Sequence, residues 1–105
     1  MVSRQLEIPQ DAIAEFCRRW QITELAVFGS ALGPDFRSDS DVDVLVTFAA
    51  GARWTLFDMV HMREELEKIV GRHVDLVSRR GVERSRNALR RKAILGSAES
   101  IYVQG

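Results

Sequence analysis

The sequence predicts a small α/β (α+β) domain, in which a mixed β-sheet is flanked by helices. Three observations predict this class. Helix and strand patterns alternate along the chain, 46% of the residues are apolar, and 105 residues are enough for one domain. We therefore expect residues 1–105 to form a single domain, without the separate cofactor and substrate domains of larger enzymes.

The N-terminal half combines one helix with two short strands. Residues 9–20 place apolar side chains three and four positions apart, which is helical spacing, and Pro9 suits the first turn. Residues 24–29 are a short apolar run that ends at a Gly-Ser pair, which predicts a buried strand. After a loop over residues 31–40, residues 42–48 are β-branched and aromatic and predict a central strand.

A second helix is predicted over residues 55–70. Thr55 is a suitable N-cap and Gly71 a suitable C-cap. The apolar side chains that repeat at helical spacing, and that we expect to face the core, are Leu56, Met59, Val60, Leu66, Ile69 and Val70.

The C-terminal third holds one more strand and a basic helix. Residues 73–78 predict the third strand, and residues 82–95 predict the helix. Residues 101–103 are either a terminal strand or a tail. The order α-β-β-α-β-α is typical of a small α/β domain, with no internal repeat.

Charge is balanced over the chain but unevenly distributed. There are 15 basic and 15 acidic residues, yet residues 79–92 hold seven basic residues against one acidic residue, a formal charge of +6. This segment is a solvated helix face, a surface for a partner or for RNA, or a contact to a triphosphate. No aromatic residue lies among its arginines, so we expect no direct nucleic-acid binding.

The chain carries no sign of a membrane or an oxidising compartment. A single cysteine, Cys17, excludes an intramolecular disulfide, and no apolar run approaches the length of a membrane-spanning helix. We expect a cytoplasmic protein without a membrane partner.

Three aspartates are the candidate chemical groups. Asp41 and Asp43 lie two positions apart at the start of a predicted strand, where both side chains share a face about 6.6 Å apart. Asp75 lies within the predicted buried strand 73–78. If the two strands are neighbours, three carboxylates converge and can hold two Mg²⁺ ions, as phosphoryl and nucleotidyl transfer require. The alternatives are a solvated acidic strand end for the pair and an arginine partner for Asp75.

A Gly-Ser pair, Gly29 and Ser30, ends the first predicted strand. Backbone N–H groups and a hydroxyl at such a turn can bind phosphate oxygens, and glycine permits close approach of the backbone. Nine residues separate Ser30 from Ser40, which opens the segment Ser-Asp-Val-Asp.

Residues 27–46, Val-Phe-Gly-Ser through Ser-Asp-Val-Asp-Val-Leu-Val, resemble the signature of the minimal nucleotidyltransferases of the DNA polymerase β-like superfamily. The resemblance extends over about residues 10–103, with Asp75 at the position of the third aspartate. It implies the nucleotidyltransferase fold and a reaction in which a hydroxyl attacks the α-phosphorus of ATP and releases pyrophosphate.

The resemblance also assigns roles to individual residues. The nucleotide-binding residues are Gly29 and Ser30 at the β- and γ-phosphates, with Ser40 and Arg37 from the same loop region. The catalytic and metal-binding residues are Asp41, Asp43 and Asp75, which would hold two Mg²⁺ ions, and Asp75 would help to deprotonate the attacking hydroxyl. The chain departs from many relatives in one respect, since Ala31, Leu32 and Gly33 follow the Gly-Ser pair where those relatives carry an arginine.

Relatives of this size are antitoxins paired with a helical toxin of the HEPN ribonuclease class. The resemblance implies that this chain forms a hetero-oligomer with such a toxin and neutralises it by transferring AMP from ATP to one of its tyrosines. A catalytically weak or inactive module that neutralises its partner by binding alone is the alternative, and a regulatory domain of a larger enzyme is a third. The sequence leaves open the acceptor residue and the number of nucleotides transferred.

Overall fold

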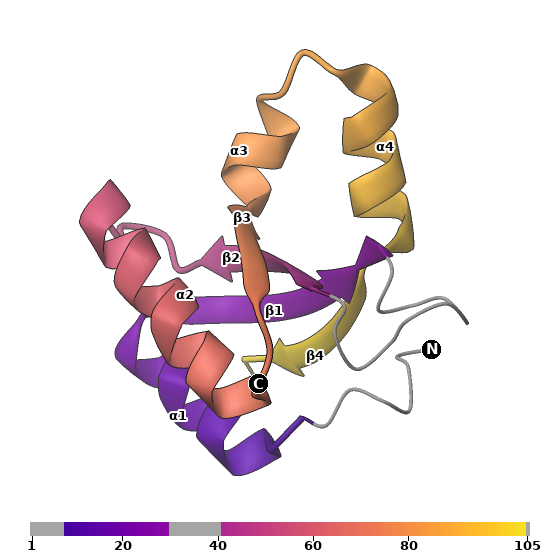
Figure 1. The fold of residues 1–105 in the computed structure, drawn as a ribbon. Helices are drawn as coiled ribbons and strands as arrows, with labels where there is room; N and C mark the ends of the chain where they lie inside the picture. Colours follow the sequence, from indigo (N-terminus) through magenta and orange to yellow (C-terminus); the bar gives the residue numbers. More distant parts are fainter. Residues whose placement is uncertain (1–7, 30–40, 105) are drawn as a thin grey trace.

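The computed structural model describes residues 8–29 and 41–104 as a four-stranded mixed sheet with helices on both faces (Figure 1). This confirms the predicted fold class. The elements, in chain order, are α1 (Gln10–Arg19), β1 (Ile22–Phe28), β2 (Val42–Phe48), α2 (Leu56–Val70), β3 (Val74–Ser78), α3 (Arg79–Glu83), α4 (Ala88–Ser97) and β4 (Glu99–Val103).

The strands lie in the order β3-β2-β1-β4. β1 is antiparallel to both β2 and β4, whereas β2 and β3 are parallel. The parallel pair needs a crossover connection, which α2 supplies. β2 therefore lies between two strands, as its apolar sequence predicts, and β3 is an edge strand.

One face of the sheet carries the main hydrophobic core. Figure 1 shows α1 and α2 next to each other along this side. Fully buried side chains from both helices, among them Phe16 and Met62, pack against Leu25 of β1 and Val44 of β2. The free thiol of Cys17 lies in the same core, and burial raises its pKa to about 12.

The opposite face carries a smaller apolar cluster under α3 and α4, which rise from that side of the sheet in Figure 1. Val82 of α3 and Ile94 of α4 pack there against Ala26, Phe28 and Leu45. Side chains alternate between the faces of a strand, so Asp43 lies on the face of Leu45. The smaller cluster therefore borders the aspartates.

The ends of α2 are as the sequence predicts. Thr55 caps the helix by accepting a hydrogen bond from the Asp58 backbone N–H, and Asp58 accepts in return from Thr55 N–H at 2.8 Å. Gly71 adopts a left-handed conformation at the C-cap, with φ of 72°.

The first turn of α2 departs from the expected core pattern. Leu56 is 85% exposed and Val60 is 43% exposed, although both belong to the apolar repeat of the sequence. Phe57 beside them is 81% exposed. The part of α2 that is fully buried against the core is centred on Met62 and Leu66, one to two turns later.

The single basic helix predicted over residues 82–95 is wrong. The segment forms two helices, α3 and α4, separated by residues 84–87. Two side chains in this connection bind the backbone and stop a continuous helix: Ser85 Oγ accepts from Asn87 N–H, and Asn87 Oδ1 accepts from Arg90 N–H. Asn87 is thereby the N-cap of α4.

The bounds of β1 differ slightly from the prediction, and the structure decides between the two alternatives for residues 101–103. β1 starts at Ile22 rather than at residue 24 and ends before Gly29. Residues 101–103 belong to a strand, β4, which pairs with β1. No helix in the described part of the chain has the length and apolar character needed to cross a bilayer.

Candidate active site

Asp43 and Asp75 are direct neighbours in the sheet. Each is the second residue of its strand, and the parallel register of β2 and β3 pairs them. Neighbouring strands lie about 4.8 Å apart, so the two carboxylates project from the N-terminal ends of β2 and β3, on the same face of the sheet. The structure therefore confirms that the strands of Asp43 and Asp75 lie side by side.

The burial of the aspartates differs from the sequence expectation in one case. Asp75 is exposed, because β3 is an edge strand whose central residues are only partly covered. The expectation of an acid within a buried strand was therefore wrong. Asp43 is half-buried on the central strand, and Asp41 is exposed and immediately precedes it.

Gly29 lies against the Asp43 carboxylate. It directly follows β1, and its φ of 70° is a conformation that side chains disfavour. A Cβ atom at this position would lie 2.5 Å from Asp43 Oδ2, which is closer than such atoms approach. The absence of a side chain at Gly29 leaves the space that this carboxylate occupies.

The electrostatics of the cluster centre on Asp43. Partial burial raises the pKa of the Asp43 carboxyl, and the negative charges of Asp75 and Asp41 raise this pKa further. The positive charge of Arg90 on α4 lowers it. Negative charges thus accumulate at the N-terminal ends of β2 and β3, and the positive charge that opposes them comes from α4.

Arg90, whose positive charge acts on Asp43, was not identified individually from the sequence. It lies in the basic segment 79–92, for which a contact to a triphosphate was one of several alternatives. The signal was its spacing to Ile94, because residues four apart share a helix face and Ile94 is buried against the sheet. That spacing places Arg90 on the sheet side of α4.

The remaining predicted site residues, Ser30, Arg37 and Ser40, lie outside the described residues, between the end of β1 and Asp41. Their assigned roles stay predictions.

The aspartates suit a hard divalent cation by their chemistry. Within residues 8–29 and 41–104, no three histidine, cysteine or acidic side chains already stand close enough to hold a metal ion. Nevertheless, the three carboxylates offer oxygen ligands, and the negative charges of Asp41 and Asp75 act on Asp43, a repulsion that a bound divalent cation would relieve. By donor chemistry alone, these carboxylates suit Mg²⁺.

The chain is similar to known nucleotide-transferring proteins. The family model of the nucleotidyltransferase domain matches residues 10–100. The protein adenylyltransferase MntA of Thermococcus cleftensis is 38% identical over 63 residues, which are 60% of this chain and 62% of that protein. A candidate protein adenylyltransferase of Methanocaldococcus jannaschii, MJ0435, is 33% identical over 54% of this chain and 59% of its own length. The matches thus span about three-fifths of these relatives.

Solved structures share the fold. A candidate minimal nucleotidyltransferase is 36% identical, with a TM-score of 0.64 and a match over 86% of each chain. A chain from a toxin–antitoxin crystal structure with AMP-PNP has a TM-score of 0.69 at 17% identity, over 92% of this chain and 75% of that one. The second likeness concerns the fold alone. Since the family model covers most of the chain, the chain belongs to the nucleotidyltransferase domain family.

Proposed function

We propose that this chain is a Mg²⁺-dependent protein adenylyltransferase and acts as an antitoxin. It transfers AMP from ATP to a tyrosine hydroxyl of a HEPN-class toxin, with which it forms a hetero-oligomer, and thereby neutralises the toxin. The observation that carries the proposal is the register that pairs Asp43 with Asp75 beside Gly29.

The similar proteins support the choice of substrate and partner. MntA is named a protein adenylyltransferase. Another structure with the same fold is an MNT antitoxin in complex with a tri-AMPylated HEPN toxin of Shewanella oneidensis, with a TM-score of 0.60 and 18% identity over 90% of this chain and 70% of that chain. The same activity and the same class of partner are what we propose here.

The transfer exchanges one phosphorus–oxygen bond for another. The tyrosine oxygen bonds to the α-phosphorus of ATP, the bond to the bridging oxygen of the β-phosphate breaks, and pyrophosphate leaves with that electron pair. The hydroxyl proton passes to Asp75, the exposed carboxylate at the open edge of the sheet.

Each residue of the site has a separate task in this reaction. Asp41, Asp43 and Asp75 would hold two Mg²⁺ ions, which neutralise negative charge on the phosphate oxygens when bound. Gly29, together with Ser30, would bring backbone N–H groups to the β- and γ-phosphates. The chain thus positions its reactants, and positioning supplies much of the rate in reactions of this class.

The proposal is tested with ATP labelled at the α-phosphate, the HEPN-class partner and Mg²⁺. The wild-type protein should transfer label to the partner, and Asp43→Ala should not. The control is Glu64→Gln, because Glu64 is an exposed acid on α2, and this variant should transfer label as the wild type does. Equal labelling by Asp43→Ala would remove the aspartates from the mechanism. Neutralisation of the partner without any transfer would favour the binding-only alternative, with which the sequence Ala31, Leu32, Gly33 is compatible.

A further inference from the structure

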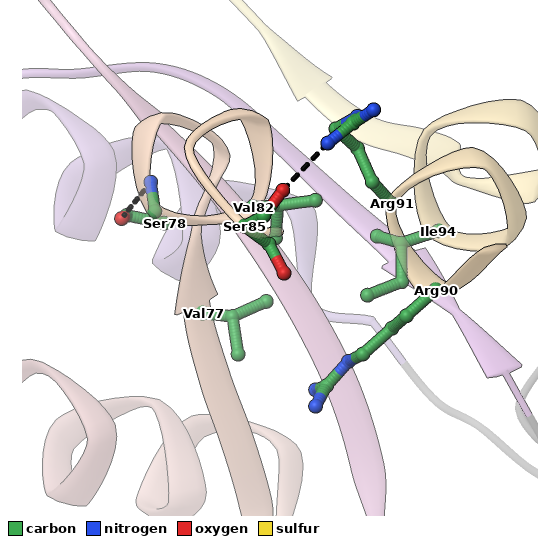
Figure 2. A pocket seen from close by; sticks show the side chains of 8 residues that line it. Val77, Ser78, Val82, Ser85, Arg90, Arg91 and Ile94 are labelled. Carbon is green, nitrogen blue, oxygen red and sulfur yellow. Dashed lines mark hydrogen bonds between the residues drawn. The ribbon is translucent and has the colours of Figure 1, made fainter. Parts of the chain in front are cut away.

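A cavity of about 300 Å³ lies between α3 and α4, beyond the predicted site residues. Figure 2 shows its walls: Val82 comes from α3, and Arg90, Arg91 and Ile94 come from α4. Val77 of β3 lies at its base. The cavity therefore combines an apolar floor with two guanidinium groups.

The cavity adjoins the aspartates along the strands. Val77 is two residues beyond Asp75 on β3, so the two side chains share a face and are about 6.6 Å apart. The neighbouring pair on β2, Asp43 and Leu45, follows the same order. A ligand that touches Asp43 and Asp75 can thus reach the cavity by extending along one face of the sheet.

The two arginines of the cavity have different surroundings. Arg91 Nη1 donates to the Ser85 carbonyl oxygen at 2.5 Å and so holds the connection between α3 and α4 (Figure 2). Arg90 points away from this bond, and within residues 8–29 and 41–104 no hydrogen bond or ion pair occupies its guanidinium. Its charge nevertheless acts on Asp43. Arg90 is therefore a cation at the border of the cavity and the carboxylate cluster.

A triphosphate bound at this site needs a positive side chain. Among residues 29–40, which follow β1, Arg37 is the one basic residue, and it is itself a predicted nucleotide-binding residue. Guanidinium groups bind phosphate oxygens through two parallel N–H donors, and such charge-assisted bonds are strong. Arg90 has this chemistry, and no other described residue acts on Asp43 as an opposing charge.

We propose that Arg90 is a nucleotide-positioning residue, which binds the phosphate groups of the nucleoside triphosphate from α4 while the aspartates lie on the opposite side of those phosphates. This inference rests on the proposed function, since it assumes that a triphosphate is the substrate. It gives a role to one residue of the basic segment: Arg90 adds a second positive side chain, in addition to Arg37, to a site whose other predicted residues are acidic or uncharged.

Calorimetric binding of AMP-PNP and of adenosine, each with Mg²⁺, tests the proposal. Arg90→Gln should weaken AMP-PNP binding by about 10- to 100-fold, as expected for the loss of hydrogen bonds to a charged group. Adenosine binding should not change, because adenosine has no phosphate. Arg90→Lys should recover part of the loss, since it restores the charge without the paired donors.

Lys92→Gln is the matched control. Lys92 is exposed on the same helix two positions further, so it carries the same charge on the opposite side of α4. It should bind AMP-PNP as the wild type does. Equal affinity of Arg90→Gln and wild type for AMP-PNP would overturn the role of Arg90. An equal loss for adenosine would overturn it too, because Arg90 would then act on the nucleoside. Failure of the wild type itself to bind AMP-PNP would overturn the proposed function instead.

Discussion

The Asp43 carboxylate, at the start of β2, occupies the space in which a side chain at Gly29, just after β1, would lie. A side chain at Gly29 would begin 2.5 Å from Asp43 Oδ2, and the backbone at Gly29 has a φ of 70°. The position thus has two separate requirements, a left-handed backbone and room for a carboxylate. Only the second concerns the chemistry of the site.

Gly29→Ala is therefore expected to lower both stability and transfer. The left-handed backbone should cost about 1–2 kcal/mol of folding free energy with alanine. Because the new methyl group must displace the Asp43 carboxylate, AMP transfer should fall by about 100-fold, the effect of a misplacement near 1 Å. Denaturant titration and the labelled-ATP assay measure the two effects.

The control is Gly71→Ala. Gly71 has nearly the same backbone, with φ of 72°, but nothing lies within 4 Å of the position of its Cβ. This variant should lose similar stability and keep its transfer rate. A transfer rate that falls equally in both variants would mean that stability alone governs activity and that the contact with Asp43 has no separate role.

Asp43 should make the stability of the ligand-free protein depend on pH. Its pKa is raised in the folded state above the ordinary 3.8, so its favourable contribution is complete below that pH and is lost as the pH rises through the folded-state pKa. Asp43→Asn cannot ionise and should be more stable than the wild type at neutral pH, with no such advantage below pH 3.8. Denaturant titrations across this range measure the difference.

Mg²⁺ should reverse that order. At about 100 times its dissociation constant, a cation bound only by the folded state adds about 2.7 kcal/mol to the free energy of unfolding. The wild type should gain this stability and Asp43→Asn should not. Equal stabilisation of both proteins would place the Mg²⁺ site elsewhere.

Glu67 of α2 should show the opposite pH dependence. Its Oε2 accepts a hydrogen bond from the backbone N–H of Val74 at 2.9 Å, and this bond, with the charges of Arg63 and His73, lowers the pKa of the carboxyl below 4.5. The stabilising contribution is therefore present above pH 4.5 and is lost as the pH falls through the folded-state pKa.

Glu67→Ala should consequently be less stable than the wild type at neutral pH, with a difference that shrinks in acid. Glu67→Gln keeps an oxygen for Val74 N–H and should retain part of the stability without the pH dependence. A stability difference between Glu67→Ala and wild type that does not change between acidic and neutral pH would contradict the assigned contact, because a contribution from the ionised carboxylate must disappear when the carboxyl is protonated.

The two sides of α2 should respond differently to truncation. Met62 is fully buried in the main core, so Met62→Ala should cost about 2–5 kcal/mol. Phe57 is 81% exposed, and Phe57→Ser should change the folding free energy by less than about 0.5 kcal/mol. Thermal unfolding of both variants checks the prediction, and a large loss in Phe57→Ser would show that this residue is buried.

The sequence predicted the parts of the fold that depend on local pattern. The caps at Thr55 and Gly71 depend on a few adjacent residues, and the central position of β2 follows from its continuous apolar run. The adjacency of Asp43 and Asp75 was conditional in the sequence, because strand order is a property of the whole chain. The adjacency is established by the parallel register of β2 and β3, which local sequence patterns do not reveal.

The errors have local physical causes. Ser85 and Asn87 bind nearby backbone N–H groups and divide the basic segment, which its charge pattern alone did not indicate. The exposure of Leu56 and Val60 could not be read from helical spacing, because the spacing does not say where along a helix the sheet ends. The sequence did not single out Arg90, because Asp43, the carboxyl on which its charge acts, is 47 residues away in the chain.

Adenylyl transfer is tested most directly by the intact mass of the HEPN-class partner after incubation with this protein, ATP and Mg²⁺. We expect a mass increase by one or more whole AMP units with the wild-type protein and an unchanged mass with Asp41→Ala. An unchanged partner mass with the wild type, in a mixture where the partner is nevertheless neutralised, would contradict adenylyl transfer as the function of this chain.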